Sequence, residues 1–188
     1  MKGQETIYNR EGESYLIEVN LSTIAQLFNS LDPAPFREKD LDPAAEEYIV
    51  SAAGDFSLQT PIKLVIHLPG EIAASEQAKS LPEAVHNYFD YRRMVMAHHL
   101  RQTMQIGHRA LLIGLGFLIT CILAQQVITS LGREGLFWSI IEEGFLISGW
   151  VAMWYPINLF LYEWWPTRKR QQLYGKLAQI ATEIRALT

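Results

Sequence analysis

Two adjacent carboxylates, Glu142 and Glu143, directly precede an uncharged apolar segment, 144–162. Carboxylates at such a boundary either face water or lie within a membrane. Within a membrane a charged side chain has a high free-energy cost, and such residues mostly have a function. A ring of them around an oligomer axis would concentrate cations at the mouth of a pore. The side-chain amides of Gln125 and Asn158 lie inside the apolar segments and are the other candidates to line a polar path through a membrane. Their alternative role is hydrogen bonding between helices.

Four histidines fall in a region where a helix is expected, and they are His86, His98, His99 and His108. One helix can offer two metal ligands at positions i and i+4, but a metal site needs three or four that converge. His86 and Asp90 form the one such pair of a histidine and a carboxylate here. We therefore expect exposed or interhelical histidines, with no metal and no cofactor.

An acidic cluster between residues 32 and 47 lacks the Asp-x-Asp-x-Asp-Gly pattern of a calcium loop. A turn explains Asp32, and Asp42 before Pro43 has the pattern of a helix cap. The sequence contains no P-loop, GxGxxG, GxSxG or HExxH motif. We accordingly expect no catalytic residue, and the protein is predicted not to be an enzyme.

Two uncharged apolar segments, 110–131 and 144–162, are each long enough to cross a bilayer core of roughly 30 Å. The short linker between them predicts a two-helix transmembrane hairpin over 110–162. Small residues on both segments favour close helix packing, and they are Gly114, Gly116, Gly144, Ser148, Gly149 and Ala152. Aromatic side chains are placed to anchor the hairpin at the two membrane interfaces, and they are Trp138, Tyr162, Trp164 and Trp165.

Basic residues flank both spans, whereas the linker carries only Arg133. The flanking set is Arg92, Arg93, Arg101, Arg109, Arg168, Lys169, Arg170 and Lys176. By the positive-inside rule both termini are cytoplasmic, which predicts a multi-pass protein of a bacterial inner membrane. These cations suit anionic lipid at the cytoplasmic face better than nucleic acid. The single cysteine, Cys121, allows no intrachain disulfide.

The segment 1–70 is predicted to form a small cytoplasmic domain of the β-α-α-β type. Alternating apolar residues predict strands at 15–21 and 62–68, with a short helix over 22–31 and a second one from Pro43 to Gly54. Two strands are marginally stable in water. We therefore expect further sheet from a neighbouring copy, or helices that cover both faces.

The segment 71–109 is predicted to be a helical stalk that is continuous with the first span. Ser80-Leu81-Pro82-Glu83 has the pattern of a capping box, so one helix is expected from Leu81 to about Leu131. The segment 163–188 is predicted to be a C-terminal amphipathic helix. Its apolar seam, spaced four and three residues apart, is Leu173, Leu177, Ile180, Ile184 and Leu187, and it needs a partner helix.

Three parts of the sequence together resemble an uncharacterised family of bacterial two-span inner-membrane proteins. They are LFNSLDPAPF with DLD, the stretch from LPEAV to YR, and EGFLISGWVA with YEWWP, at 27–42, 81–92 and 143–166. The resemblance implies a bacterial inner membrane and an N-terminal cytoplasmic domain, with no assigned activity and no catalytic residues.

Together these features predict an α+β membrane protein with a non-enzymatic role. We expect a self-associating inner-membrane scaffold, or an accessory subunit of an assembly with other membrane subunits. The alternative is a homo-oligomeric ion channel or transporter, with Glu142 and Glu143 at its outer mouth and Gln125 and Asn158 along its path.

Overall fold

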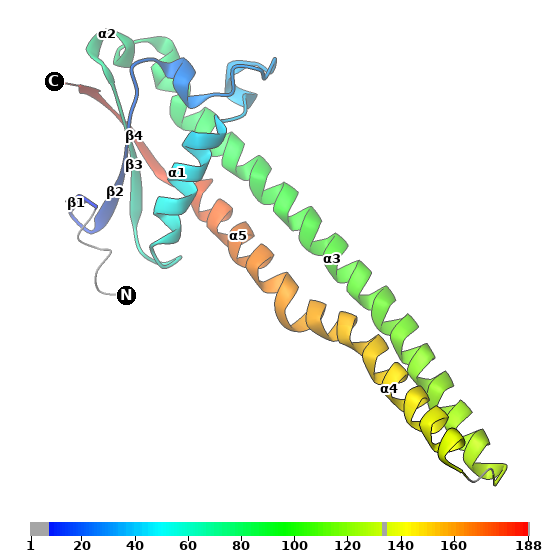
Figure 1. Cartoon of the computed structure of the whole chain (residues 1–188). Coiled ribbons are helices and arrows are strands. Elements are labelled where there is room, and N and C mark those ends of the chain that lie inside the picture. The colour runs from blue at the N-terminus through cyan, green and yellow to red at the C-terminus, as the bar shows by residue number, and fades with distance from the viewer. Residues whose placement is uncertain (1–7, 133–134, 188) are drawn as a thin grey trace. The chain divides into compact units, whose positions relative to one another are not determined.

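The structure is a computed structural model that describes residues 8–132 and 135–187 (Figure 1). The chain divides into two compact units. Residues 1–96 and 169–188 form the first, here called the sheet unit, and residues 97–168 form the second, the hairpin unit. This division joins the two flanks of the apolar region into one unit, whereas the sequence predicts four consecutive segments.

The sheet unit contains four strands in the order β1-β2-β3-β4. They are β1 (Arg10–Glu11), β2 (Ser14–Asn20), β3 (Ile62–Pro69) and β4 (Ala181–Leu187). β1 pairs antiparallel with β2, and β2, β3 and β4 are parallel to one another. The two strands expected from alternating apolar residues, 15–21 and 62–68, are present as β2 and β3.

The prediction of a helix over all of 163–188 is wrong in its second half. The helix α5 (Trp164–Leu177) ends at Leu177, and Ile184 and Leu187 lie on β4. The extra sheet comes from the chain's own C-terminal segment, which pairs along β3 from Lys63 to Pro69. Five of the eight residues of β3 are buried and the other three are half-buried, so its backbone groups need a strand on each side. That requirement outweighs the helical spacing of the seam.

Short helices connect β2 to β3, and they are η1 (Ile24–Leu27), η2 (Phe36–Glu38) and α1 (Pro43–Gly54). α1 begins as expected, since the Asp42 side chain accepts a hydrogen bond from the Ala44 amide at 2.9 Å. The helix expected over 22–31 is one short 3₁₀ turn, η1. Phe28 leaves it in extended conformation and pairs with Leu41 in an isolated bridge.

After β3 come the short helix α2 (Gly70–Ala73) and the long helix α3 (Glu76–Ser130). α3 covers the predicted stalk and the first apolar segment, but it begins five residues before Leu81. The cap is Ser75, whose hydroxyl accepts a hydrogen bond from the Ala78 amide at 3.1 Å. The capping box expected at Ser80 is not formed, because Ser80 lies inside the helix and its hydroxyl donates to the Gln77 carbonyl.

One face of the sheet carries the apolar core. Ile17, Leu64 and Ile66 point to this face and are fully buried. Helical residues from α1, α3 and α5 complete the cluster, among them Ile49, Leu81, Val85, Phe89, Tyr174 and Leu177. Figure 1 shows α1 and the first turns of α3 beside this face of the strands. The helices therefore cover one face of the sheet, and the other face carries mostly polar side chains.

The hairpin unit consists of residues 97–130 of α3, the helix α4 (Leu136–Asn158), the π-helical turn η3 (Leu159–Glu163) and the first residues of α5. α4, η3 and α5 follow one another as continuous helix from Leu136 to Leu177. Pro156 lies inside α4, two residues before its end. Proline removes one backbone hydrogen bond, and the wider turn η3 begins shortly after this position.

A polar cluster ties α1, α3 and α5 together within the sheet unit. The Glu46 carboxylate accepts hydrogen bonds from the hydroxyls of Tyr88 at 2.7 Å and Tyr174 at 2.6 Å, and from Arg92 Nε at 3.0 Å. Burial opposes ionisation of Glu46, but the hydrogen bonds from both tyrosines and the Arg92 charge hold its pKa below the ordinary value. The ionised carboxylate is thus the form that the fold stabilises.

We expect Glu46→Gln to lower the free energy of unfolding by about 2 kcal/mol near neutral pH, because a charged acceptor of three hydrogen bonds is lost. A lowered pKa contributes stability that is present above the unfolded value and is lost as pH falls through the folded value. The difference between wild type and variant should therefore shrink below pH 4.5. Urea unfolding of the full chain in mild detergent, followed by circular dichroism, measures it.

Glu47→Gln is the matched control, because Glu47 is the neighbouring carboxylate on the same helix. It should leave stability within about 0.5 kcal/mol of wild type. A Glu46→Gln effect of the same size at pH 7 and pH 3.5 would contradict the assignment of an ionised Glu46.

Candidate functional site

The hairpin unit exposes its apolar side chains. In the most apolar 18-residue windows of its two helical segments, only 11% and 17% of the residues are buried. Large side chains such as Leu112, Trp150 and Trp154 are 59% to 73% exposed. A core helix of a water-soluble protein would bury such residues. Both helices are thus long and apolar enough to cross a membrane.

Small residues hold the two helices of the hairpin in contact. Gly107, Gly114 and Cys121 are buried on α3 at spacings of seven, and Gly149 and Pro156 are buried at the same spacing on α4. A methyl group on Gly149 would lie 2.7 Å from Leu118 Cδ1, and one on Gly114 would lie 3.1 Å from the Ala152 carbonyl oxygen. A seven-residue repeat of small residues is a close-packing seam.

This seam includes part of the small-residue set that the sequence indicates. Gly114, Gly149 and Ala152 lie in the contact. Gly116 and Gly144 face away from it, because a methyl group on either one would have no neighbouring atom within 4 Å. The sequence alone shows which residues are small, but the side on which each one packs follows from the pairing of the two helices.

Two of the candidate polar positions, Glu142 and Asn158, have side-chain partners inside the hairpin. The Thr129 hydroxyl lies 3.0 Å from Glu142 Oε1 and also 3.0 Å from the Gln125 carbonyl oxygen. Asn158 Nδ2 donates to Glu163 Oε1 at 3.0 Å, and Glu143 is exposed. Glu142 therefore contacts Thr129, whose other neighbour is the backbone of Gln125 and not its side-chain amide, whereas Asn158 belongs to a separate contact beside η3.

The aromatic residues expected at the interfaces are mostly exposed. Tyr162 and Trp165 are each 67% exposed. Trp164 is half-buried, and its indole nitrogen donates to the Phe160 carbonyl at 2.6 Å while Arg168 lies 5.6 Å above its ring. Trp138 packs edge-to-face against Phe137. Amphipathic rings and a neighbouring arginine at the ends of apolar helices are typical of membrane interfaces.

Three of the histidines in this region have hydrogen-bonding neighbours. His86 Nε2 lies 2.7 Å from the Ile180 carbonyl oxygen, where the chain passes from α5 to β4. His98 pairs with Gln102, and His108 with the Met104 carbonyl, each within about one helical turn. Among the described residues, no three of the histidine, cysteine and carboxylate side chains gather as a metal site would require.

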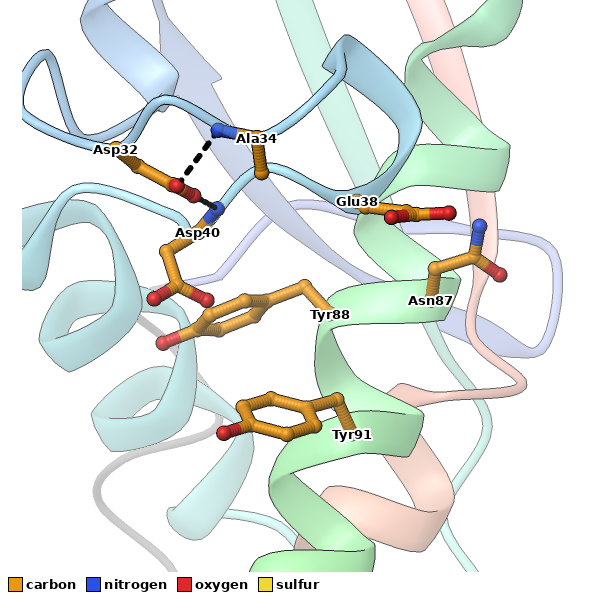
Figure 2. Close-up of a pocket in the computed structure, with 7 residues that line it drawn as sticks. All are labelled: Asp32, Ala34, Glu38, Asp40, Asn87, Tyr88 and Tyr91. Carbon is orange, nitrogen blue, oxygen red and sulfur yellow. Dashed lines mark hydrogen bonds between the residues drawn. The ribbon is translucent and has the colours of Figure 1, made fainter.

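The sheet unit has an open groove of about 510 Å³ beside α3 (Figure 2). Its lining consists of Asp32, Ala34, Glu38, Asp40, Asn87, Tyr88 and Tyr91. The Asp32 carboxylate is used by the loop, since it accepts from the amides of Ala34 at 2.9 Å and Asp40 at 2.6 Å, and these bonds lower its pKa. Figure 2 shows Asp40 beside the ring of Tyr88, with the ring of Tyr91 on the other side of Tyr88. Carboxylates next to tyrosine rings suit a cationic group.

The polar face of the sheet carries a group of charges that sequence reasoning missed. We define this charged face by Glu11, Glu18, Lys63, His67, Glu183 and Arg185, which come from all four strands. Arg185 bonds to Glu11 at 2.6 Å and to Glu183 at 2.9 Å, Lys63 pairs with Glu11 and Glu183, and His67 lies 3.0 Å from Glu18.

Opposite charges set the ionisation of this face. Hydrogen bonds from Arg185 and Lys63 lower the pKa of Glu183 to about 2, and hydrogen bonds to Glu183 and Glu11 raise the pKa of Lys63. The signal that could have found the face is the pair of polar positions 63 and 67 on one strand against 183 and 185 on the other. It becomes visible only once 181–187 is aligned with β3 as a strand.

Comparison of the chain with protein-family models, curated proteins and solved structures gives no match.

We expect Gly149→Val to loosen the hairpin, because its added carbon atoms would overlap Leu118, whose Cα lies only 3.4 Å from the Cβ position. Overpacking of this kind costs about 1–3 kcal/mol. Thermal unfolding in one mild detergent should show a lower midpoint for this variant.

Gly144→Val is the control, since that position has open space around it. It lies on the same helix and should unfold near the wild-type temperature. Equal midpoints for the two variants would mean that the seam does not hold the helices together.

Proposed function

We propose that the protein is a membrane-anchored scaffold or accessory subunit, in which the hairpin unit anchors the chain and the sheet unit makes protein contacts. The proposed location is a bacterial inner membrane with both termini cytoplasmic. The role is non-enzymatic and involves self-association. The observation that carries the proposal is the pairing of β3 with β4, which come from opposite sides of the apolar region in the sequence.

The pairing of these strands supports the proposed topology. β3 precedes both candidate spans, and β4 follows both. A parallel ladder from Lys63 to Pro69 forms only if the two flanks share one aqueous compartment. An even number of crossings meets this condition, and the chain has two candidate spans. The argument is independent of charge, and it agrees with the basic residues on both flanks, which favour the cytoplasmic side.

The exterior of the hairpin supports an anchor. Its outward side chains are apolar and large, and its helix contact is built from small residues. In lipid there is no hydrophobic force between helices, so close packing of small residues is the available means of association. A carboxylate at the end of a membrane anchor needs a hydrogen-bond partner, and Glu142 has one within the hairpin, the Thr129 hydroxyl.

Single-cysteine labelling tests the topology in a Cys121→Ala background. We expect Leu131→Cys, at the turn of the hairpin, to react with a membrane-impermeant maleimide in intact spheroplasts. Gln59→Cys before β3 and Gln172→Cys on α5 are exposed positions of the sheet unit and should react only after lysis. Carbonate extraction of the same membranes should leave the protein in the pellet.

The two sheet-unit cysteines control for each other, because they lie on opposite flanks of the hairpin in the sequence. Labelling of one but not the other in intact spheroplasts would overturn the shared compartment. Release of the protein by carbonate would overturn the anchor itself.

A further inference from the structure

β4 is an outer strand of the sheet with an unpaired side. It is the last strand in the order β1-β2-β3-β4, and within the described residues no strand pairs with its outer edge. On the opposite side of the sheet, β1 is only two residues long and pairs with Ser14 and Tyr15 of β2, so the unpaired part of β2 is shorter than the seven residues of β4. A long unpaired edge is a template for another strand, and proteins usually shorten, bend or cover such edges.

The sequence of β4 is complementary to itself when two copies run antiparallel. A twofold axis perpendicular to the sheet keeps every side chain on its own face, so only registers that oppose residues of equal parity are possible. A register centred on Glu183 or on Arg185 places that charge opposite its own copy. The register centred on Ile184 instead places Glu183 opposite Arg185 of the second copy, twice.

The same register gives the longest possible ladder. β4 runs from Ala181 to Leu187, so Ile184 is its middle residue, and all seven residues find a partner. Opposite charges directly across an antiparallel pair stabilise it, and like charges destabilise it. Charge complementarity and the number of paired residues are separate arguments, and both favour the register centred on Ile184.

The two faces of the joined sheet would remain continuous. Glu183 and Arg185 belong to the charged face, and both are partly exposed there. Ile184 lies on the opposite face, half-buried beside the core, and would contact Ile184 of the second copy. Apolar pairs on one face and ion pairs on the other are the units that stabilise a sheet.

We propose that two copies of this chain associate through their β4 strands, antiparallel and centred on Ile184, to form one continuous eight-stranded sheet. The inference rests on the self-association part of the proposed function and names its surface.

Cysteine cross-linking tests the register in the full chain, in nanodiscs and a Cys121→Ala background. Ile184→Cys should form a disulfide dimer under mild oxidation, because the opposed Cβ atoms lie about 5 Å apart. Ala186→Cys, on the same face of the same strand, should not self-link, since it would lie four residues, or about 14 Å, from its copy. A mixture of Ala186→Cys with Thr182→Cys should link, as these positions oppose each other.

Arg185→Glu tests the charge pairing, because it turns both opposite-charge pairs into like-charge pairs. We expect dimerisation to weaken by on the order of tenfold, measured by native mass spectrometry across a dilution series. Lys63→Gln is the control, since it removes a partner of Glu183 within one copy and leaves the cross-copy pairs in place. Retained circular dichroism verifies that both variants fold.

The outcomes separate this inference from the proposed function. If the chain forms a dimer but Ile184→Cys gives no disulfide and Arg185→Glu does not weaken dimerisation, the β4 interface is overturned. Self-association would then still stand. A monomer would overturn both the interface and self-association, and so would a disulfide that joins Ile184→Cys only to a different protein. Carbonate extraction tests the membrane anchor independently of these results. Self-linking of Ala186→Cys would contradict the register.

Discussion

The pairing of β4 with β3 is the constraint on which the rest of the structure depends. It joins strands separated by both candidate spans, so the sheet unit is complete only after the whole hairpin has been made. The entropy cost of closing so long a loop rises only with the logarithm of its length. Antiparallel packing of the two helices lowers that cost further, because a hairpin brings its ends back together. Glu46, Tyr88 and Tyr174 then join α1, α3 and α5 around the same closure.

Local signals made several elements predictable from the sequence. Alternating apolar residues identified β2 and β3, and Asp42 before Pro43 identified the start of α1. The absence of a strong helix breaker identified the long α3, although the cap proved to be Ser75 and not Ser80. These features depend on neighbours in the chain, so a single sequence carries them.

β4 could not be identified in the same way. Leu173, Leu177 and Ile180 continue a helical spacing into Ile184 and Leu187, and no glycine or proline follows Leu177 to end the helix. What ends it is the edge of β3, more than a hundred residues earlier, together with the His86 contact to the Ile180 carbonyl. The charged face was missed for the same reason, because Glu183 and Arg185 meet Lys63 and Glu11 only across the completed sheet.

The two units solve opposite physical problems, and this supports assigning them different tasks. The sheet unit buries its large apolar residues in one cluster and displays ion pairs, as a domain in water must. The hairpin unit displays large apolar residues and buries Gly107, Gly114 and Cys121 at spacings of seven. Such an apolar surface is suited to contact with lipid tails, which are as apolar as its own side chains. Under the proposed scaffold role, selective contacts would belong to the sheet unit, whose longest unpaired strand edge within the described residues is β4.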